Sequence, residues 1–339
     1  MNQKQKNNVL IIGGGICGLI AANVLKNNGI KSTILDKGRG IGGRLATRRI
    51  RHSEETIGVF DYGMQFFAVE DATVQKWLAQ WLAEGVVTEY SHQDIDPETS
   101  YYRGVESNRS LGQYLAKDLD IHLQTRAINI KSSDSGWTVA TENGQSFQGD
   151  RLILTAPIPQ SLTLLENSGI ALPSLIKSRL EQVVYHPRIT ILALLEELSL
   201  IPASGWLKLD DSCLASIACN HKKGISPQGF AVTIHSTPEF SHDHWQTDDG
   251  IIAEKLFNLA STWLGSKVIN YQVHRWRYSH PKTVYGESFL ALDNPGSLIL
   301  AVFLWPISRE SVFLLLPYLL WSPVGTYVTW EMIFLNPLD

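Results

Sequence analysis

The sequence predicts an α/β protein in which a parallel, nucleotide-binding sheet is joined to a second α+β domain built on a mostly antiparallel sheet. The apolar run 9–12 leads into a glycine-rich turn and a helical segment, and a second apolar run, 32–35, ends at Asp36. This order is the βαβ unit of nucleotide-binding folds. Strand-like runs within 182–240, separated by turns containing Pro or Gly, predict the second sheet. At 339 residues the chain is longer than one core usually fills, so we expect two domains.

The composition is that of an ordinary globular protein, with 44% hydrophobic and 18% charged residues, and it excludes a disordered chain. The net charge of -4 provides no general attraction for nucleic acid or an anionic membrane, so any anion must be recognised locally. Cys17, Cys213 and Cys219 lack a C-x-x-C spacing. Their number and spacing argue against a disulfide framework or a cysteine zinc site and favour a reducing, cytoplasmic location.

The turn after the first apolar run carries the strongest motif. Gly13, Gly15 and Gly18 form G-x-G-x-x-G between a predicted strand and a predicted helix. The first glycine permits the tight turn, the second lets backbone approach a pyrophosphate, and the third permits close helix packing. Asp36, at the end of the next strand, is placed to accept hydrogen bonds from a ribose. Cys17 lies inside the motif, where a small buried residue is favoured over a redox role.

The stretch GRGIGGRLATRR, residues 38–49, places glycines and arginines directly after this acidic residue. In Rossmann-type folds that bind FAD, a second glycine pair followed by an arginine commonly supports the pyrophosphate. Gly42, Gly43 and Arg44 stand at that place. Arg48 and Arg49 are interpreted equally well as phosphate contacts or as solvated surface charges.

Hydrophobic periodicity predicts the remaining elements. Helices are expected over 73–84, where the tryptophans are interpreted as core residues, and over 110–118 and 250–264. Strands are expected over 121–130, 136–141, 151–155 and 273–279.

Seven segments together resemble, in order and spacing, the renalase branch of the flavin amine-oxidase superfamily. They are IIGGGICGL, DKGRGIGGRLATRR, FDYGMQFF, DRLILTAPIPQ, DSCLASIACNHKK, VTIHSTPEF and HRWRYSHP. The resemblance runs from about residue 9 to about residue 301. The first three segments identify the superfamily, and the later ones favour renalase-like members over monoamine oxidases.

This resemblance implies a two-dinucleotide-binding fold with noncovalent FAD and a substrate cavity between the flavin and the second domain. It implies an FAD-dependent oxidoreductase that oxidises isomeric dihydronicotinamides, the 2- or 6-dihydro forms of NAD(P), by hydride transfer to the flavin. Reoxidation by O2 would give NAD(P)+ and hydrogen peroxide. No nucleic-acid or membrane partner is expected, and the sequence carries no signal of an oligomeric state.

The resemblance also implies roles for four cavity residues. Gln65 and Phe66 would lie beside the flavin ring, and Phe66 stands where animal renalases have a tyrosine. His235 and Trp276 match other cavity residues of the family, with Trp276 able to wall the nicotinamide. Hydride transfer mainly needs alignment, so all four are expected to position the reactants rather than to act as acids or bases. Without the resemblance, His235 and Trp276 would be interpreted as core residues.

The residues expected to bind the cofactor are Gly13, Gly15, Ile16, Cys17, Gly18, Asp36, Lys37, Gly42, Gly43, Arg44, Gln65 and Ile128. Arg275 and Arg277 are interpreted as edge-strand charges or as contacts for substrate phosphates. His242 and His244 lack a third ligand nearby, which argues against a metal site. The expected FAD-binding domain comprises 1–65, 105–160 and 280–301, and the expected substrate domain comprises 66–104 and 161–279.

The last part of the chain departs from the family. Members close with a strand of the type L-x-L-A-G-D, whereas SLILA at 297–301 is followed here by VFLWPISRE. Residues 311–330 carry no charge and are long enough for a membrane span, although Pro317, Pro323 and Gly325 argue against one. The abrupt change indicates an altered reading frame or gene end, so 302–339 is expected to form an atypical apolar tail. Two alternatives therefore stay open: an FAD-dependent amine oxidoreductase with another substrate, and a non-catalytic nucleotide-binding remnant.

Overall fold

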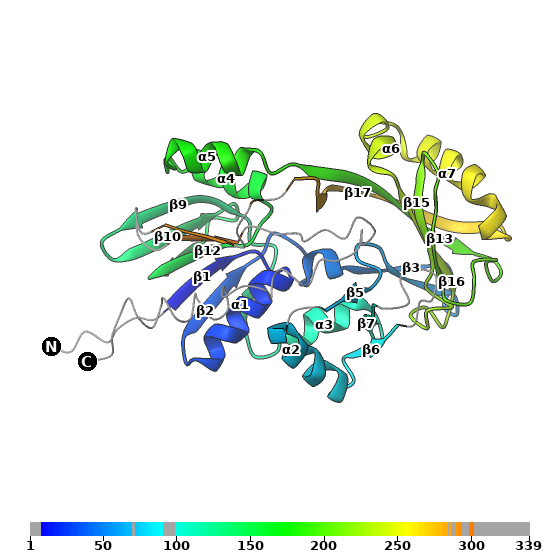
Figure 1. Ribbon diagram of the computed structural model, residues 1–339, viewed down its shortest axis with the longest axis horizontal. Helices are drawn as coiled ribbons and strands as arrows, with labels where there is room; N and C mark the ends of the chain where they lie inside the picture. The colour runs from blue at the N-terminus through cyan, green and yellow to red at the C-terminus, as the bar shows by residue number, and fades with distance from the viewer. Residues whose placement is uncertain are drawn as a thin grey trace.

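The computed structural model describes residues 8–69, 72–90, 99–283, 285, 289–292 and 298–301. It has two lobes, each built around one large sheet (Figure 1). The tail predicted over 302–339 lies outside the described residues.

The first lobe is built on a six-stranded sheet. From one edge to the other it contains β18 (Phe289–Leu292), β19 (Leu298–Ala301), β12 (Arg151–Leu154), β1 (Asn8–Ile12), β2 (Lys31–Leu35) and β8 (Asp120–His122). The last five run parallel, and β18 pairs antiparallel with β19. Helix α1 (Ile16–Asn27) joins β1 to β2, so the predicted βαβ unit is confirmed.

Apolar side chains on both faces of this sheet form the first core. Leu10 and Ile11 are fully buried on opposite faces of β1, as expected for a strand covered on both sides. Helix α2 (Ala72–Ala83) buries Leu78 and Trp81 in the same cluster as Leu19 of α1. The predicted helix over 73–84 is thus confirmed, with Trp81 in the core and Trp77 partly buried against it.

Shorter elements surround the six-stranded sheet. Three antiparallel strands, β9 (Ala127–Ser133), β10 (Gly136–Thr141) and β11 (Ser146–Gly149), form a separate sheet. A second small sheet contains β5 (Phe67–Ala68), β7 (Tyr101–Gly104) and β6 (Val87–Glu89), and a hairpin contains β3 (Thr47–Arg51) and β4 (Ile57–Asp61). The remaining helices of this part are the 3-10 helix η1 (Gly43–Leu45), α3 (Asn108–Leu115), α4 (Ile158–Asn167) and α5 (Ser174–Glu181).

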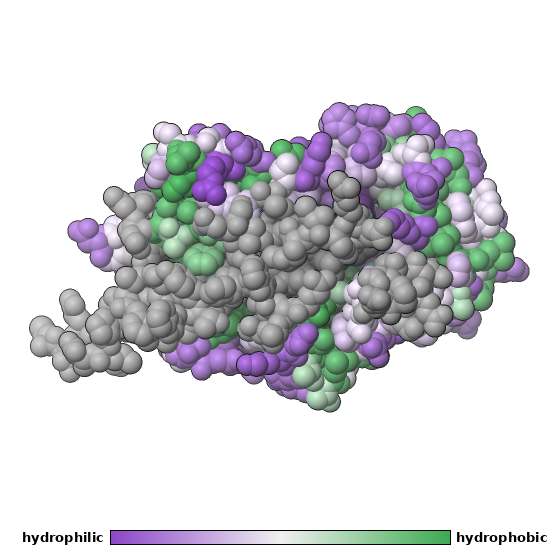
Figure 2. Space-filling model, in the orientation of Figure 1, coloured by the Kyte–Doolittle hydropathy of each residue, from purple (hydrophilic) through white to green (hydrophobic). Residues whose placement is uncertain are grey.

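The second lobe is a five-stranded antiparallel sheet, as the strand-like runs predict. Its order is β14 (Trp206–Lys208), β15 (Leu214–Cys219), β16 (Phe230–Ser236), β13 (Tyr185–Leu195) and β17 (Val268–Pro281). Helices α6 (Pro238–Asp243) and α7 (Asp249–Leu264) cover its outer side (Figure 1). The surface over α6 is mainly hydrophilic (Figure 2).

Alternation along the strands gives this sheet two different faces. Ile191 and Ile234 pair across β13 and β16 and pack with Leu256 of α7. On the other face, Thr190 pairs with both His235 and His274. The face that carries Thr190 and His235 therefore turns toward the first lobe. The β3–β4 hairpin packs against the same face through an apolar cluster that includes Phe60.

The segment 66–104 contacts both lobes. Phe67 packs in the core of the first lobe, whereas Phe66 and Tyr101 pack against Trp206 of the second sheet. The proposed division of the chain into two domains stays a prediction, with this segment lying at the boundary between them.

Candidate functional site

The two glycine-rich loops predicted to hold a pyrophosphate lie against each other. The Gly42 N–H donates to the carbonyl oxygen of Gly14 at 2.8 Å, and Gly15 and Gly42 form an isolated parallel bridge. Gly13 and Gly42 have φ values of +121° and +98°, which side chains with a Cβ rarely adopt. The two loops therefore form one continuous backbone surface without side chains at these glycines.

Gly15 and Gly18 have different roles within the first loop. A Cβ at Gly15 would meet nothing within 4 Å, whereas a Cβ at Gly18 would lie 1.9 Å from the carbonyl oxygen of Gly13. Gly15 therefore faces open space at the beginning of α1, which has no side-chain cap. Gly18 is a packing residue, as its predicted role requires, and it does not line the cavity described below.

Asp36 organises the two loops in addition to its predicted ribose contact. Its Oδ2 accepts from Gly14 N and its Oδ1 from Gly38 N, each at 2.6 Å. An ionised carboxylate has about four acceptor positions, so two stay available for a ribose diol.

The loops open into a cavity of about 1160 Å³ between the two lobes. Ten of the predicted cofactor residues line it: Gly13, Gly15, Ile16, Cys17, Asp36, Lys37, Gly42, Gly43, Arg44 and Ile128. Tyr62 and three residues of β17, His274, Trp276 and Tyr278, also line it. The cavity thus extends from the glycine loops to the second sheet.

The lining of this cavity is strongly basic. It contains Lys37, Arg39, Arg44, Arg48, Arg109, Arg126, Arg275 and Arg277, and Asp36 is the acidic residue among the described lining. Arg126 forms an ion pair with Glu142, and Arg275 forms one with Asp249. Arg49, by contrast, is exposed and lies outside the lining. The net positive lining attracts an anionic ligand.

Arg44 connects the second glycine loop to the second lobe. Its Nη1 donates to the carbonyl oxygen of Ser279 on β17 at 2.9 Å. Burial lowers the pKa of Arg44, so the guanidinium loses hydration that an anionic ligand would replace. Cys17 is also buried, and burial raises the pKa of its thiol to about 12, which excludes a reactive thiolate at neutral pH.

Trp276 forms part of the cavity wall, and its predicted contact with the nicotinamide stays a prediction. Its Nε1–H donates to the carbonyl oxygen of Tyr62 at 3.1 Å, and the two rings stack with centroids 5.1 Å apart. His274 completes the group, edge-on to both rings. Burial lowers the pKa of His274 to about 4, so its imidazole is neutral at physiological pH.

Gln65, Phe66 and His235 are absent from the lining of this cavity in the described structure, and their expected contact with flavin or substrate stays a prediction. All three are at most 1% exposed. Phe66 packs among Tyr90 and other aromatic rings at the interface between the lobes. The polar side chains of Gln65 and His235 are used in buried hydrogen bonds, which hold them one layer behind the wall.

His235 supports the wall through the same backbone carbonyl as Trp276. Its Nε2 lies 3.1 Å from the Tyr62 carbonyl oxygen, and because a carbonyl only accepts, Nε2 carries the proton. Its Nδ1 lies 3.3 Å from Ser216 Oγ, which completes its hydrogen bonds. Burial, with the nearby Arg188 guanidinium, lowers the pKa of His235 to about 3. The residue is therefore a neutral support.

Lys223 was not predicted as a functional residue, although it occupies the centre of the lobe interface. It is 2% exposed and donates to both the backbone oxygen and Oε1 of Gln65, at 3.0 and 2.9 Å. Burial lowers its pKa to about 8, against the raising effect of Asp61. Only its position in the quoted DSCLASIACNHKK segment pointed to it, because no sequence pattern predicts a buried lysine.

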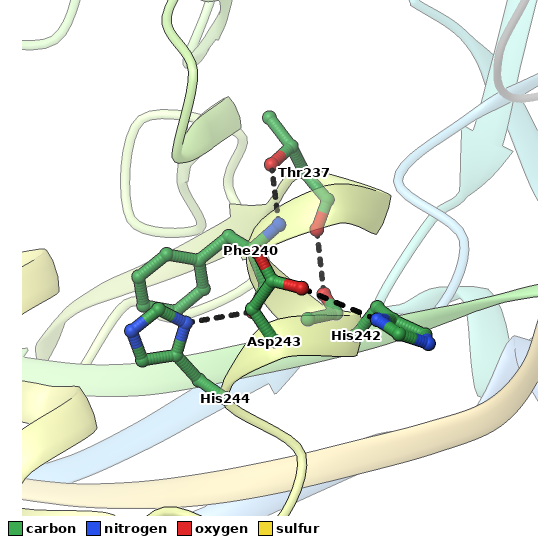
Figure 3. Close-up of polar contacts among 6 residues, drawn as sticks. Thr237, Phe240, His242, Asp243 and His244 are labelled. Carbon is green, nitrogen blue, oxygen red and sulfur yellow. Dashed lines mark hydrogen bonds and ion pairs between the residues drawn. The ribbon is translucent and has the colours of Figure 1, made fainter.

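The two histidines around α6 make separate contacts. Figure 3 shows the two imidazoles pointing to opposite sides, His242 toward Asp243 and His244 stacked on Phe240. Nδ1 of His244 bonds to the carbonyl oxygen of Phe240. No group of three or more His, Cys, Asp or Glu suited to a metal occurs within the part of the chain that the structure describes.

The fold and cavity define a two-lobed dinucleotide-binding protein with a basic cleft. Comparisons with known proteins agree. A model of the NAD(P)-binding Rossmann-like domain matches residues 11–81, and a model of flavin containing amine oxidoreductases matches residues 76–291. The chain belongs to the flavin-containing amine oxidoreductase family and is an FAD-dependent oxidoreductase.

The relatives include oxidases and an isomerase. Renalase of Mus musculus is 25% identical over 320 residues, covering 86% of this chain and 89% of the mouse protein. An Exiguobacterium protein assigned as a protoporphyrinogen oxidase superposes with a TM-score of 0.62 and 14% identity, covering 85% of this chain and 90% of its own. A fatty acid isomerase from P. acnes gives 0.58 and 12%, covering 82% and 87%. These structures show that the fold is shared. They do not identify the substrate, which has to be inferred from the residues of the site.

The end of the chain is similar to a different family. A model of the TspO/MBR family matches residues 290–335. Its first part overlaps β18 and β19, which belong to the six-stranded sheet, so the departure from the flavin family falls inside this match. No helix of the described residues is long and apolar enough to cross a membrane.

The residues present fit a flavin dinucleotide. The bare backbone at Gly15 leaves room for a pyrophosphate, and the Arg109 Nε is buried without a hydrogen-bond partner among the described residues. Because Arg109 also lines the cavity, a bound anion there would supply the missing acceptor.

Proposed function

We propose that this protein is a renalase-like oxidase of isomeric dihydronicotinamides, the 2- or 6-dihydro forms of NAD(P), and that its FAD is held noncovalently. The observation that carries the proposal is the charge of the cavity: eight basic residues and one acidic residue line it. A polyanionic dinucleotide is attracted to such a lining, whereas the ammonium group of an amine is repelled. The similarity to mouse renalase supports the same substrate class.

The glycine loops, Asp36 and Arg44 hold the cofactor in this proposal, and Trp276 and Tyr62 orient the substrate ring. Bound FAD supplies the hydride acceptor, and O2 restores its oxidised form with release of hydrogen peroxide. Trp276 offers a flat aromatic face, fixed by its hydrogen bond to Tyr62, on which a dihydropyridine stacks. The neutral His274 adds no proton-transfer step, because hydride transfer requires alignment rather than an acid.

Anaerobic mixing of the FAD-loaded, full-length protein with single substrates tests the proposal. The absorbance of oxidised flavin near 450 nm should bleach rapidly with the 2- or 6-dihydro isomer of NAD or NADP. It should bleach slowly with the ordinary 4-dihydro form and with a primary amine or a polyamine. Rapid bleaching by an amine, with none by the isomers, would reverse the assignment. A protein that takes up no FAD would favour the non-catalytic remnant instead.

A matched pair of arginine variants tests the electrostatic argument. Arg48 lines the cavity and donates to Gln272 Oε1 at 3.1 Å, whereas its neighbour Arg49 is exposed outside it. Arg48→Met should raise the substrate concentration needed for half-maximal bleaching by about fivefold to tenfold, and Arg49→Met should leave it unchanged. Equal effects of the two variants would contradict a specific role for the cavity charge.

Flavin release distinguishes the mode of attachment. Cys17 lines the cavity but is a buried, protonated thiol, which argues against a covalent link through sulfur at that place. Denaturation in acid should therefore release all of the flavin into the supernatant. Flavin that stays with the precipitated chain would show covalent attachment.

A further inference from the structure

Arg109 lies at the beginning of α3, beside the second glycine loop. It lines the cavity, yet its Nε is buried and has no hydrogen-bond partner among the described residues. No ion pair to a described carboxylate involves Arg109 either. A guanidinium in a partly enclosed site without an acceptor has unmet hydrogen-bonding capacity.

Two glycines allow α3 to approach the second glycine loop. A Cβ at Gly112 would lie 3.2 Å from Cα of Gly42, so the helix and the loop are in backbone contact. Arg109 is three residues earlier and therefore projects from the same face of the helix. Its Nη2 lies 3.6 Å from the position of a Cβ at Gly40, so the guanidinium covers that part of the loop.

A buried carboxylate fixes the start of α3 and thereby the position of Arg109. Asp61 is fully buried and accepts from Asn108 N at 3.1 Å and from Thr47 Oγ1 at 2.5 Å. Arg109 N also lies 3.3 Å from Thr47 Oγ1. These bonds connect β3, β4 and α3, so Arg109 is held by the scaffold of the cavity rather than by a free loop.

We propose that Arg109 binds the pyrophosphate of FAD from the side of the second glycine loop that α3 contacts. The guanidinium covers Gly40, which lies between Gly38, bonded to Asp36 at the ribose end, and Gly42, which contacts the first loop. A planar guanidinium can donate to two phosphate oxygens at once, and a phosphate oxygen would supply the acceptor that the buried Nε of Arg109 lacks. Asp36 forms no ion pair with Arg109 among the described residues, and its two oxygens accept from Gly14 N and Gly38 N.

Binding to the apoprotein tests this assignment without reference to turnover. Arg109→Met should weaken FAD binding, followed by flavin fluorescence, by about tenfold to a hundredfold. Arg109→Lys should recover part of the affinity, because lysine keeps the positive charge but cannot donate two parallel hydrogen bonds as a guanidinium does. ADP, which carries the adenosine and the pyrophosphate without the riboflavin part, should lose affinity to the same extent as FAD. Riboflavin, which has no phosphate, should bind both proteins equally. Arg51→Met, an exposed arginine outside the cavity, is the matched control.

Three outcomes would overturn the proposal. An unchanged affinity for FAD in Arg109→Met would show that the guanidinium does not contact the cofactor. An equal loss of riboflavin and FAD binding would show a structural role. A loss for FAD without a loss for ADP would place the contact away from the pyrophosphate. Far-ultraviolet circular dichroism of the apoproteins verifies that the variants fold. The result does not depend on which dihydronicotinamide is oxidised, so this proposal and the proposed function fail separately.

Discussion

The indole of Trp276 and the backbone of Tyr62 are joined by a 3.1 Å hydrogen bond, and the same two residues stack their rings 28° from parallel. Tyr62 follows β4 of the first lobe, and Trp276 belongs to β17 of the second. The contact therefore links the lobes at the wall of the cavity. It holds an aromatic plane at a fixed angle, which is what alignment of a planar substrate requires.

Trp276→Phe removes this hydrogen bond but retains an aromatic ring. We expect the apparent dissociation constant of the substrate in anaerobic mixing to rise about fivefold, as for the loss of one hydrogen bond. Flavin content should stay unchanged, because the substitution leaves intact the glycine loops and Asp36, which hold the cofactor in the proposed function. Trp77→Phe, on α2 outside the cavity, is the control. A variant with wild-type affinity would remove Trp276 from the substrate site.

Gly15→Ala should separate folding from cofactor binding. The backbone at Gly15 has φ -74°, which alanine adopts, and its Cβ would meet no protein atom within 4 Å. The apoprotein should therefore unfold at the wild-type temperature, while FAD affinity falls tenfold or more because the new methyl group fills the approach of the pyrophosphate. Thermal unfolding and flavin absorbance measure the two effects.

Gly18→Ala provides the contrast, because its Cβ would lie 1.9 Å from a backbone oxygen. This variant should lose thermal stability as well as flavin. If Gly15→Ala were equally unstable, the proposed open space at Gly15 would be wrong.

The neutral state of His235 makes stability depend on pH. Burial, assisted by Arg188, lowers its pKa to about 3, while the unfolded chain titrates near 6.5. Below pH 6.5 the unfolded state therefore binds more protons than the folded state. Stability is fully present above pH 6.5 and declines as the pH falls toward 3, by up to about 1.4 kcal/mol per pH unit for this group.

Denaturant titrations between pH 7 and pH 4 measure this slope. The free energy of unfolding of His235→Gln should fall less steeply with decreasing pH than that of the wild type. The difference in slope should correspond to about one proton taken up on unfolding. His242→Gln changes a histidine whose side chain is 83% exposed, so it should leave the slope unchanged. Identical slopes for His235→Gln and the wild type would contradict a buried neutral imidazole.

Arg188 is a buried cation without a counter-ion among the described residues. It is 5% exposed, its Nε has no hydrogen-bond partner, and burial lowers its pKa to about 10, so it stays charged at pH 7. Such a charge is costly to bury. Arg188→Met should therefore increase the free energy of unfolding of the apoprotein by about 1 kcal/mol or more. A decrease would mean that the guanidinium stabilises the fold.

The sequence was sufficient for the βαβ unit of the first lobe because the interactions that form this unit are local. Gly13, Gly15, Gly18 and Asp36 occur within one βαβ unit, where strand, turn and helix follow one another directly. The second glycine pair was also predictable, since Gly42 and Gly43 follow within ten residues of the same strand. In both loops the residue type reveals its role, because a bare backbone needs glycine.

What the sequence by itself determined was a nucleotide-binding βαβ unit, a second antiparallel sheet and the family. Tertiary structure alone decided that Trp276 forms the wall while His235 lies behind it, because pairing between strands distant in the chain sets which side chains reach the cavity. It also decided that Lys223 is buried and that Arg109 faces the second glycine loop. Charged residues of this kind carry no periodic signal, and only the packing of distant elements brings them to one place.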